Sequence, residues 1–303
     1  MAKIITPVVT VFNNNEKPDY EGNKKVIDFL IQGGVDGILV LGSAGEFPNL
    51  SVDERMDFFK FYAEYVNKRV KLFAGTGCVS FDDTLRLSKS AIELGYTPMI
   101  IGPYYFGIDQ EKLFIYYDKL AKSINGEIYL YNFPPRTGHS IGPETIRKLV
   151  EANKNIVGLK DSVNEPSHTN MVFRAVEGTK FVTYSGFDNQ FLENIGNNGG
   201  DGCIGALSNI VPEIWSDLVK SANKKNYNRT QAIFHLIQKL MPIYDMDTNC
   251  SLILKKLLVY RGVEINDRAV FPFNQINEEV VCKAKRLLDE VLLEYEAIKY
   301  NAI

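Results

Sequence analysis

Short apolar runs alternate with longer amphipathic segments along most of this 303-residue chain. The short runs have the length of strands and are apolar throughout, as in a parallel sheet covered on both faces. We predict strands at residues 4–12, 37–41, 71–75, 98–101, 127–132, 156–160, 181–185 and 202–204. The longer segments show helical spacing, and we predict helices at residues 20–33, 51–66, 80–95, 109–123, 143–151, 166–176, 189–197 and 212–222.

This alternation predicts an α/β protein, a (β/α)8 TIM barrel, because eight strand–helix units fit a fold that typically needs about 250 residues. A doubly wound open sheet is the alternative, but no GxGxxG turn follows Phe12 at the end of the first strand. The strand pattern stops after residue 222, and only helices are predicted beyond it, at 227–241, 251–260 and 277–298. We therefore expect a barrel over residues 1–222 and a C-terminal helical appendage over residues 223–303 that packs on it.

Local start signals support several of these helices. Ser51 followed by Glu54 fits a capping box, in which each side chain satisfies a backbone N–H of the first turn. Pro143, Pro166 and Pro212 stand at the start of predicted helices, where a proline lacks no needed hydrogen bond. The helix boundaries are therefore expected near these residues.

The composition excludes several classes of function. The chain is 45% hydrophobic and 23% charged with a net charge of −3, and it has no basic tract of the kind that binds nucleic acid. No apolar stretch is long enough to span a membrane and the N-terminus lacks a signal-peptide pattern, so we expect a cytoplasmic protein. Its cysteines and histidines are too scattered for a disulfide framework or a metal site, and we expect no metal and no cofactor. These residues are Cys78, Cys203, Cys250, Cys282, His139, His168 and His235.

Lys160 is the first candidate for chemistry because it closes the apolar strand at residues 156–160. Lysine is almost never fully buried unless it is paired or functional. Desolvation disfavours the ammonium form and leaves a neutral amine that can attack a ketone and form a Schiff base. The alternative is a lysine whose long side chain reaches solvent from the end of the strand.

Other polar residues and glycines follow the remaining strands, where a barrel of this type carries its active site. A lysine, tyrosines, a serine and glycines that converge on one rim favour a joint functional interpretation over any single motif. The segments are Gly42-Ser43-Ala44-Gly45-Glu46, Pro103-Tyr104-Tyr105, Tyr131-Asn132-Phe133-Pro134-Pro135-Arg136-Thr137-Gly138, Gly158-Leu159-Lys160-Asp161-Ser162, Ser185-Gly186 and Gly199-Gly200-Asp201-Gly202-Cys203-Ile204-Gly205.

In this order and at these separations, the motifs resemble the dihydrodipicolinate synthase/N-acetylneuraminate lyase family of class I, pyruvate-dependent aldolases. The resemblance runs from Pro7 to about Phe273. It implies a carbon–carbon lyase on a (β/α)8 barrel with a C-terminal helical region, assembled as a homotetramer. Its expected partners are small molecules, pyruvate and an aldehyde, without nucleic acid or membrane.

The resemblance also implies a role for each motif. Lys160 would form the Schiff base with pyruvate, Tyr131 would transfer protons beside it, and Ser43 would link Tyr131 to Tyr105, which often enters from the neighbouring subunit. The remaining expected contacts are with substrate: Ala44 with the pyruvate carboxylate, Arg136 with the aldehyde partner, and Gly186 and Ile204 with the pyruvate pocket.

The motifs disagree about the aldehyde. Arg136 matches the arginine that dihydrodipicolinate synthases present to the carboxylate of aspartate semialdehyde, but those enzymes have two adjacent threonines where this chain has Ser43 and Ala44. Phe47 and Asp161 resemble 2-keto-3-deoxy-gluconate aldolases, which cleave a sugar acid to pyruvate and an aldehyde. We favour the sugar-acid aldolase, with dihydrodipicolinate synthase as the alternative and N-acetylneuraminate lyase as the weakest match.

Two further hypotheses concern residues beside this site. For His168 we expect a solvent-exposed position on a helix, and the alternative is a histidine that faces the substrate. A barrel that has lost catalysis and only binds pyruvate or a sugar acid would lack the lysine or the tyrosine, and both are present.

Overall fold

The computed structural model describes residues 1–197 and 199–300. Its eight strands form a closed barrel in chain order and helices alternate with them, so the predicted (β/α)8 fold is confirmed. The strands are β1 (Lys3–Pro7), β2 (Gly37–Val40), β3 (Lys71–Gly75), β4 (Thr97–Ile101), β5 (Ile128–Asn132), β6 (Ile156–Asp161), β7 (Val182–Ser185) and β8 (Gly200–Cys203). The helices are α1 (Tyr20–Gly33), α2 (Val52–Val66), α3 (Phe81–Glu93), α4 (Gln110–Ser123), α5 (Pro134–Thr137), α6 (Pro143–Ala152), α7 (Pro166–Ala175), α8 (Phe191–Gly196), α9 (Pro212–Asn223), α10 (Tyr227–Leu240), α11 (Cys250–Tyr260) and α12 (Glu278–Tyr300).

The first strand is shorter than predicted. The apolar run extends to Phe12, but β1 ends at Pro7. Beyond it, side chains replace a neighbouring strand: the N–H of Val9 donates to Asn209 Oδ1 and the N–H of Val11 donates to Asn23 Oδ1. The chain therefore stays buried beyond the end of the paired strand, and the apolar pattern cannot distinguish a buried strand from a buried segment without strand pairing.

The expected helix starts are present. The backbone N–H of Ser51 donates to the Glu54 carboxylate, and the N–H of Glu54 donates to Ser51 Oγ, which completes the capping box. The three prolines stand in the first turns of α6, α7 and α9. The short helix α5 was not predicted, because a four-residue segment is too short to show helical periodicity.

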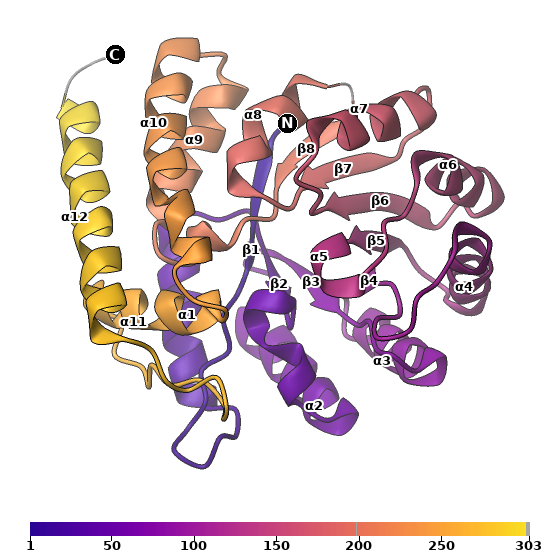
Figure 1. Ribbon diagram of the computed structural model, residues 1–303, viewed down its shortest axis with the longest axis horizontal. Helices are drawn as coiled ribbons and strands as arrows, with labels where there is room; N and C mark the ends of the chain where they lie inside the picture. The colour runs from indigo at the N-terminus through magenta and orange to yellow at the C-terminus, as the bar shows by residue number, and fades with distance from the viewer. Residues whose placement is uncertain (198, 301–303) are drawn as a thin grey trace. The chain divides into compact units, whose positions relative to one another are not determined.

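Residues 1–2, 51–63 and 71–204 form one compact unit, which contains β3 to β8. In Figure 1, β5, β6 and β7 of this unit run side by side. An aromatic layer fills the interior between alternate strands: Phe73, Tyr129 and Tyr184 have ring centroids 5.4 to 6.4 Å apart. Gly158 on β6 makes room for this layer, because a Cβ there would lie 2.2 Å from the Tyr129 ring.

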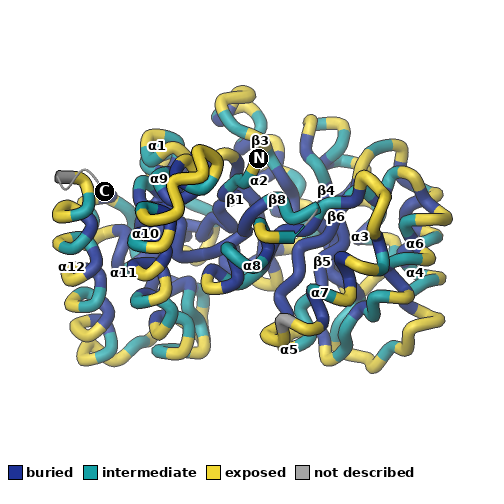
Figure 2. The backbone as a smooth tube through the Cα atoms, turned by 90° about the horizontal axis from the view of Figure 1, so that it is seen from above, coloured by how far each residue is buried: buried dark blue, intermediate teal, exposed yellow. Residues whose placement is uncertain are grey.

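The second compact unit comprises residues 3–50, 64–70 and those from 205 onward. It contains β1, β2 and the helices from α9 to α12. Along α12 the buried residues recur every three or four positions and exposed residues lie between them, as Figure 2 shows by colour. The buried positions are Val281, Ala284, Leu288, Val291 and Tyr295. The division at residue 222 stays a prediction.

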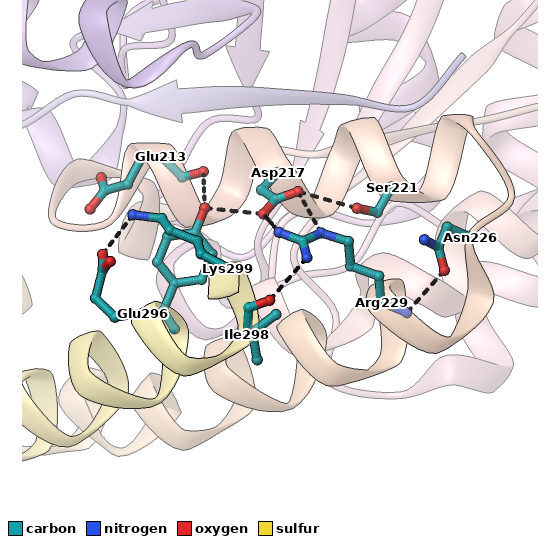
Figure 3. Close-up of polar contacts among 9 residues, drawn as sticks. Glu213, Asp217, Ser221, Asn226, Arg229, Glu296, Ile298 and Lys299 are labelled. Carbon is teal, nitrogen blue, oxygen red and sulfur yellow. Dashed lines mark hydrogen bonds and ion pairs between the residues drawn. The ribbon is translucent and has the colours of Figure 1, made fainter. Parts of the chain in front are cut away.

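A charged cluster joins three helices of this second unit (Figure 3). Arg229 on α10 donates two hydrogen bonds to the Asp217 carboxylate on α9, at 3.1 and 2.5 Å. The Tyr295 hydroxyl of α12 donates to the same carboxylate at 3.1 Å. Partial burial alone would raise the pKa of Asp217, but the hydrogen bonds and charge of Arg229 outweigh it and hold that pKa below its ordinary value.

We expect Asp217→Asn to lower the free energy of unfolding by about 1–2 kcal/mol, because Arg229 then donates to a neutral amide and no longer to a charged carboxylate. The sign with pH follows from the depressed pKa. The carboxylate stabilises the native state above its unfolded-state pKa, and this contribution is lost as the pH falls through the lower native value. Urea unfolding at pH 7 and at pH 3 should therefore show a smaller difference between the two proteins in acid. An equal difference at both pH values would contradict this assignment.

Candidate active site

Lys160 and Tyr131 meet at the carboxyl ends of two adjacent strands. They are direct partners in the register of β6 and β5, and both are buried, with 4% and 5% of their surface exposed. The Lys160 Nζ lies over the Tyr131 ring, 4.4 Å from its centroid. The alternative of a lysine that extends into solvent is therefore wrong, and the primary amine lies over the ring of a tyrosine.

The predicted pocket residues Gly186 and Ile204 follow the next two strands. The N–H of Gly186 donates to the Asp161 carbonyl at 2.7 Å, and the N–H of Ile204 donates to the Ser185 carbonyl at 2.8 Å. Position 186 is crowded for any side chain, because a Cβ there would lie 1.9 Å from the Ser162 hydroxyl oxygen and 2.9 Å from the Ser162 Cβ. Ile204 is fully buried. The hydrogen bond from Gly186 to Asp161 thus holds the backbone after β7 against the end of β6, the strand that carries Lys160.

Arg136 lies on α5, the short helix that follows β5, and its side chain is exposed. Before it, Phe133 stacks on the Tyr131 ring with centroids 5.8 Å apart, and Phe187 packs edge-on against Phe133 at 6.4 Å. These half-buried rings form an aromatic wall beside the lysine–tyrosine pair.

Tyr105, unlike this pair, is not buried in the single chain. Its side chain is 86% exposed, and its backbone has φ of 92°, which non-glycine residues rarely adopt. It packs edge-on against Phe106, which is also exposed. The role of Tyr105 stays a prediction, and such exposure is compatible with the expected entry into a neighbouring subunit.

Ser43 and Ala44 belong to the second unit, where they begin a 3₁₀ turn, Ser43–Gly45. Thr10 donates its hydroxyl to the Gly45 carbonyl at 2.7 Å. Glu46 then adopts a left-handed conformation and forms a buried ion pair with Lys255 of α11, at 2.6 Å. The turn is therefore held from both sides, while the predicted hydroxyl relay through Ser43 stays a prediction.

His168 does not have the exposed position that we expected. It is only 9% exposed, and its Nδ1 lies 3.1 Å from the carboxylate of the fully buried Asp161. Burial alone would lower the pKa of His168, but the hydrogen bond and charge of Asp161 outweigh it and raise that pKa above the ordinary value. The sequence pattern missed this pair, because α7 carries His168 back over the end of β6.

Within residues 1–197 and 199–300, no group of three or more His, Cys, Asp or Glu side chains is arranged to hold a metal ion. In the same described part of the chain, no helix is both long enough and apolar enough to cross a membrane.

A closed (β/α)8 barrel that buries a lysine beside a tyrosine at the carboxyl ends of its strands has the architecture of a barrel enzyme. The model of the dihydrodipicolinate synthetase family matches residues 1–291, and the chain belongs to this family.

Several relatives and one solved structure are similar to this chain over most of its length. YagE of Escherichia coli (strain K12), provisionally named a 2-dehydro-3-deoxy-D-gluconate aldolase, is 30% identical over 96% of this chain and 97% of its own. YjhH of the same organism, provisionally named a 2-dehydro-3-deoxy-D-pentonate aldolase, is 30% identical over 94% and 95%. A 4-hydroxy-tetrahydrodipicolinate synthase of Hydrogenobaculum sp. (strain Y04AAS1) is 32% identical over 81% and 83%. The crystal structure of YagE in complex with pyruvate has a TM-score of 0.93 and 29% identity, and it covers 97% of this chain and 99% of its own.

Proposed function

We propose that this protein is a class I aldolase that reversibly cleaves a 2-keto-3-deoxy sugar acid to pyruvate and an aldehyde. The observation that carries the proposal is the buried amine of Lys160 over the ring of Tyr131, at the rim where such barrels hold their substrates. The full-length similarity to YagE and YjhH supports the choice of a sugar acid, because both are named for keto-deoxy sugar acids.

The chemistry follows from a lysine and a phenol. The neutral amine of Lys160 attacks the ketone at C2 of the sugar acid, and loss of water leaves a protonated imine. Removal of the proton on the C4 hydroxyl then breaks the C3–C4 bond. The electron pair moves into the imine as an enamine, and the aldehyde leaves. Protonation at C3 and hydrolysis release pyruvate and regenerate the amine. In this proposal Tyr131, whose ring lies beside the amine, carries the protons in these steps.

Dihydrodipicolinate synthase, which condenses pyruvate with aspartate semialdehyde, is the second candidate. The observation that favours it is Arg136, an exposed guanidinium on the segment after Tyr131. Both enzymes would share the pyruvate imine and its enamine on Lys160, which the synthase forms from pyruvate and the aldolase forms by cleavage. The two candidates therefore differ only in the aldehyde that the enamine meets.

The deciding experiment measures kcat/KM on one preparation with keto-deoxy-gluconate, with N-acetylneuraminate, and with pyruvate plus aspartate semialdehyde. We expect the highest value for keto-deoxy-gluconate or a pentonate analogue. A higher value for the semialdehyde would replace the proposal by the synthase. Imine trapping with no turnover of any aldehyde would instead favour a barrel that only binds pyruvate.

Arg136→Ala tests the same choice from the side of the protein. The carboxylate of a keto-deoxy sugar acid lies beside the ketone, so its far end offers only hydroxyls to Arg136. Loss of such hydrogen bonds costs about 1 kcal/mol, and we expect kcat/KM for keto-deoxy-gluconate to fall about tenfold or less. Imine formation with pyruvate should be unchanged, and Arg174→Ala, at another exposed arginine, is the control. A loss of several hundredfold would indicate a carboxylate at this position.

We further propose a cytoplasmic homotetramer. Four cysteines without a disulfide support a reducing compartment. The exposed aromatic pair of Tyr105 and Phe106 supports burial against a second copy. Sedimentation equilibrium measures the assembly, and a monomer at micromolar concentration would contradict it.

A further inference from the structure

The strand ends that hold Lys160 and Tyr131 are joined on their opposite face by a second pair of side chains. In the register of β5 and β6, Tyr131 is the partner of Lys160, and Asn132 is the partner of Asp161. Successive side chains of a strand point to opposite faces, so Asn132 and Asp161 lie behind the lysine–tyrosine pair. The Asn132 amide donates to Asp161 Oδ1 at 3.0 Å.

Asp161 is fully buried, and both of its oxygens accept hydrogen bonds. Oδ1 accepts from Asn132, while Oδ2 accepts from the Thr169 hydroxyl at 2.8 Å and faces His168 Nδ1 at 3.1 Å. Thr169 and His168 both come from α7. A carboxylate that is buried to this extent and paired this completely is held in one position.

The surroundings of His168 assign its charge. Nε2 lies 3.1 Å from the Ile141 carbonyl, which can only accept a hydrogen bond, and 3.4 Å from the Ser140 hydroxyl. Nδ1 faces a carboxylate, which also accepts. Protonation of both ring nitrogens satisfies the two acceptors, the Asp161 carboxylate and the Ile141 carbonyl, and makes His168 and Asp161 a buried ion pair. The raised pKa of His168 has the same direction.

Asn132, Asp161 and His168 also hold both ends of the segment that carries Arg136. Asn132 begins this segment, and its Oδ1 accepts from the N–H of Ile141 at 3.0 Å. The Asn132 amide also contacts the Ser140 hydroxyl at 3.3 Å, and His168 binds the carbonyl of Ile141. Both ends of the chain between β5 and α6 are thus attached to Asn132, Asp161 and His168.

We propose that the Asp161–His168 ion pair is a positioning unit that sets the distance between Lys160 and Tyr131 and fixes the segment bearing Arg136. This rests on the proposed function only in assuming that Lys160 forms an imine with pyruvate. Neither residue of the pair touches the substrate in this proposal. The pair acts by holding β5, β6 and α7 together at Asp161, the residue that directly follows Lys160.

The test is Asp161→Asn, which keeps an acceptor for Asn132 but removes the charge that faces His168. A displacement of about 1 Å at a reacting group can cost about 100-fold in rate. We expect kcat to fall about 10- to 100-fold, while KM changes less than threefold and borohydride still traps pyruvate on Lys160, only more slowly. Thr169→Val is the matched control, because it removes one hydrogen bond to Oδ2 and keeps the ion pair, and its kcat should fall less than threefold.

Nitrogen NMR of the histidine rings tests whether the ion pair exists, whereas the fall in kcat at a nearly constant KM is the readout that a merely stabilising role would not move. In the unaltered protein at pH 7.5, both ring nitrogens of His168 should be protonated. The charges that act on this ring are those of Asp161 and Glu165. In the Asp161→Asn variant the ring should be neutral at the same pH, whereas the exposed His235 should be unchanged.

A neutral His168 ring in the unaltered protein would overturn the proposal, and this measurement needs no variant to fold. Wild-type kcat and trapping rate in a folded Asp161→Asn variant would also overturn it. Failure of the unaltered protein to form any pyruvate adduct would refute the proposed function instead, so the two failures are distinguishable.

Discussion

Replacing Lys160 with alanine is expected to abolish turnover and to abolish the pyruvate adduct that borohydride traps in the unaltered protein. The reason is covalent: without the amine no imine forms, and the electron pair of the breaking C3–C4 bond then has no electron sink. Alanine removes a buried side chain that lies over the Tyr131 ring, so the fold should survive with at most a modest loss of stability. Mass spectrometry of the reduced complex measures the adduct, and the aldehyde release rate measures turnover.

Two controls separate chemistry from structure in this experiment. Tyr131→Phe keeps the ring beside the lysine but removes the phenol, so it should still form the adduct while turnover falls about 100-fold or more. Peptide mapping should place the label on Lys160 and not on Lys255, the other deeply buried lysine. An adduct of wild-type yield in Lys160→Ala would exclude the proposed mechanism.

The barrel could be predicted because most of its strands are short apolar runs that alternate with amphipathic helical segments. The last residue of each apolar run marks the end of a strand, and a parallel barrel brings the carboxyl ends of all its strands to one rim. Lys160 and Tyr131 could be paired in this way, since each closes or nearly closes its strand. Gly158 could not be explained beforehand, because its reason is the ring of Tyr129 on the neighbouring strand.

The contacts of Asp161 could not be predicted for a different reason. Its side chain faces away from the rim and towards α7, and no local pattern states which helix residue will meet it. His168 has the spacing of an ordinary polar helix position, so the sequence favoured exposure, whereas the fold buries it against a carboxylate. The available signal is a strand-end carboxylate directly after a candidate lysine, because a charged group at a buried strand end needs a partner.

The ion pair of Glu46 with Lys255 joins positions 209 residues apart. Lys255 is fully buried and also donates to the Thr10 carbonyl at 3.2 Å, and the Asn249 amide contacts the second oxygen of Glu46 at 3.4 Å. Burial lowers the pKa of Lys255, and the charge and hydrogen bond of Glu46 only partly offset this. Lys255 therefore depends on the Glu46 carboxylate to stay in its ammonium form.

Glu46→Gln is expected to lower the free energy of unfolding at pH 7 by about 3–5 kcal/mol, because it leaves an ammonium group buried without its carboxylate. Without Glu46 the native pKa of Lys255 must fall further, while the unfolded value stays ordinary. The unfolded chain then binds more protons than the native one, so the stability of the variant should rise with pH between these two values. Urea unfolding at pH 7 and pH 9 checks the sign, and a loss that grows at pH 9 would contradict it.

The double variant Glu46→Gln/Lys255→Met separates the ion pair from simple packing. If the cost of Glu46→Gln is that of an uncompensated charge, methionine at position 255 should recover most of it, and the two losses will not add.

The same ion pair also affects the predicted pyruvate site. The turn Ser43–Gly45 directly precedes Glu46, so the ion pair of Glu46 with Lys255 helps to hold the turn in which Ala44 is predicted to contact the pyruvate carboxylate. KM for pyruvate should consequently be raised in Glu46→Gln and stay raised in the double variant even where stability returns, because methionine at position 255 fills the space beside residue 46 without holding the turn. Recovery of both stability and KM would show that packing alone positions this turn.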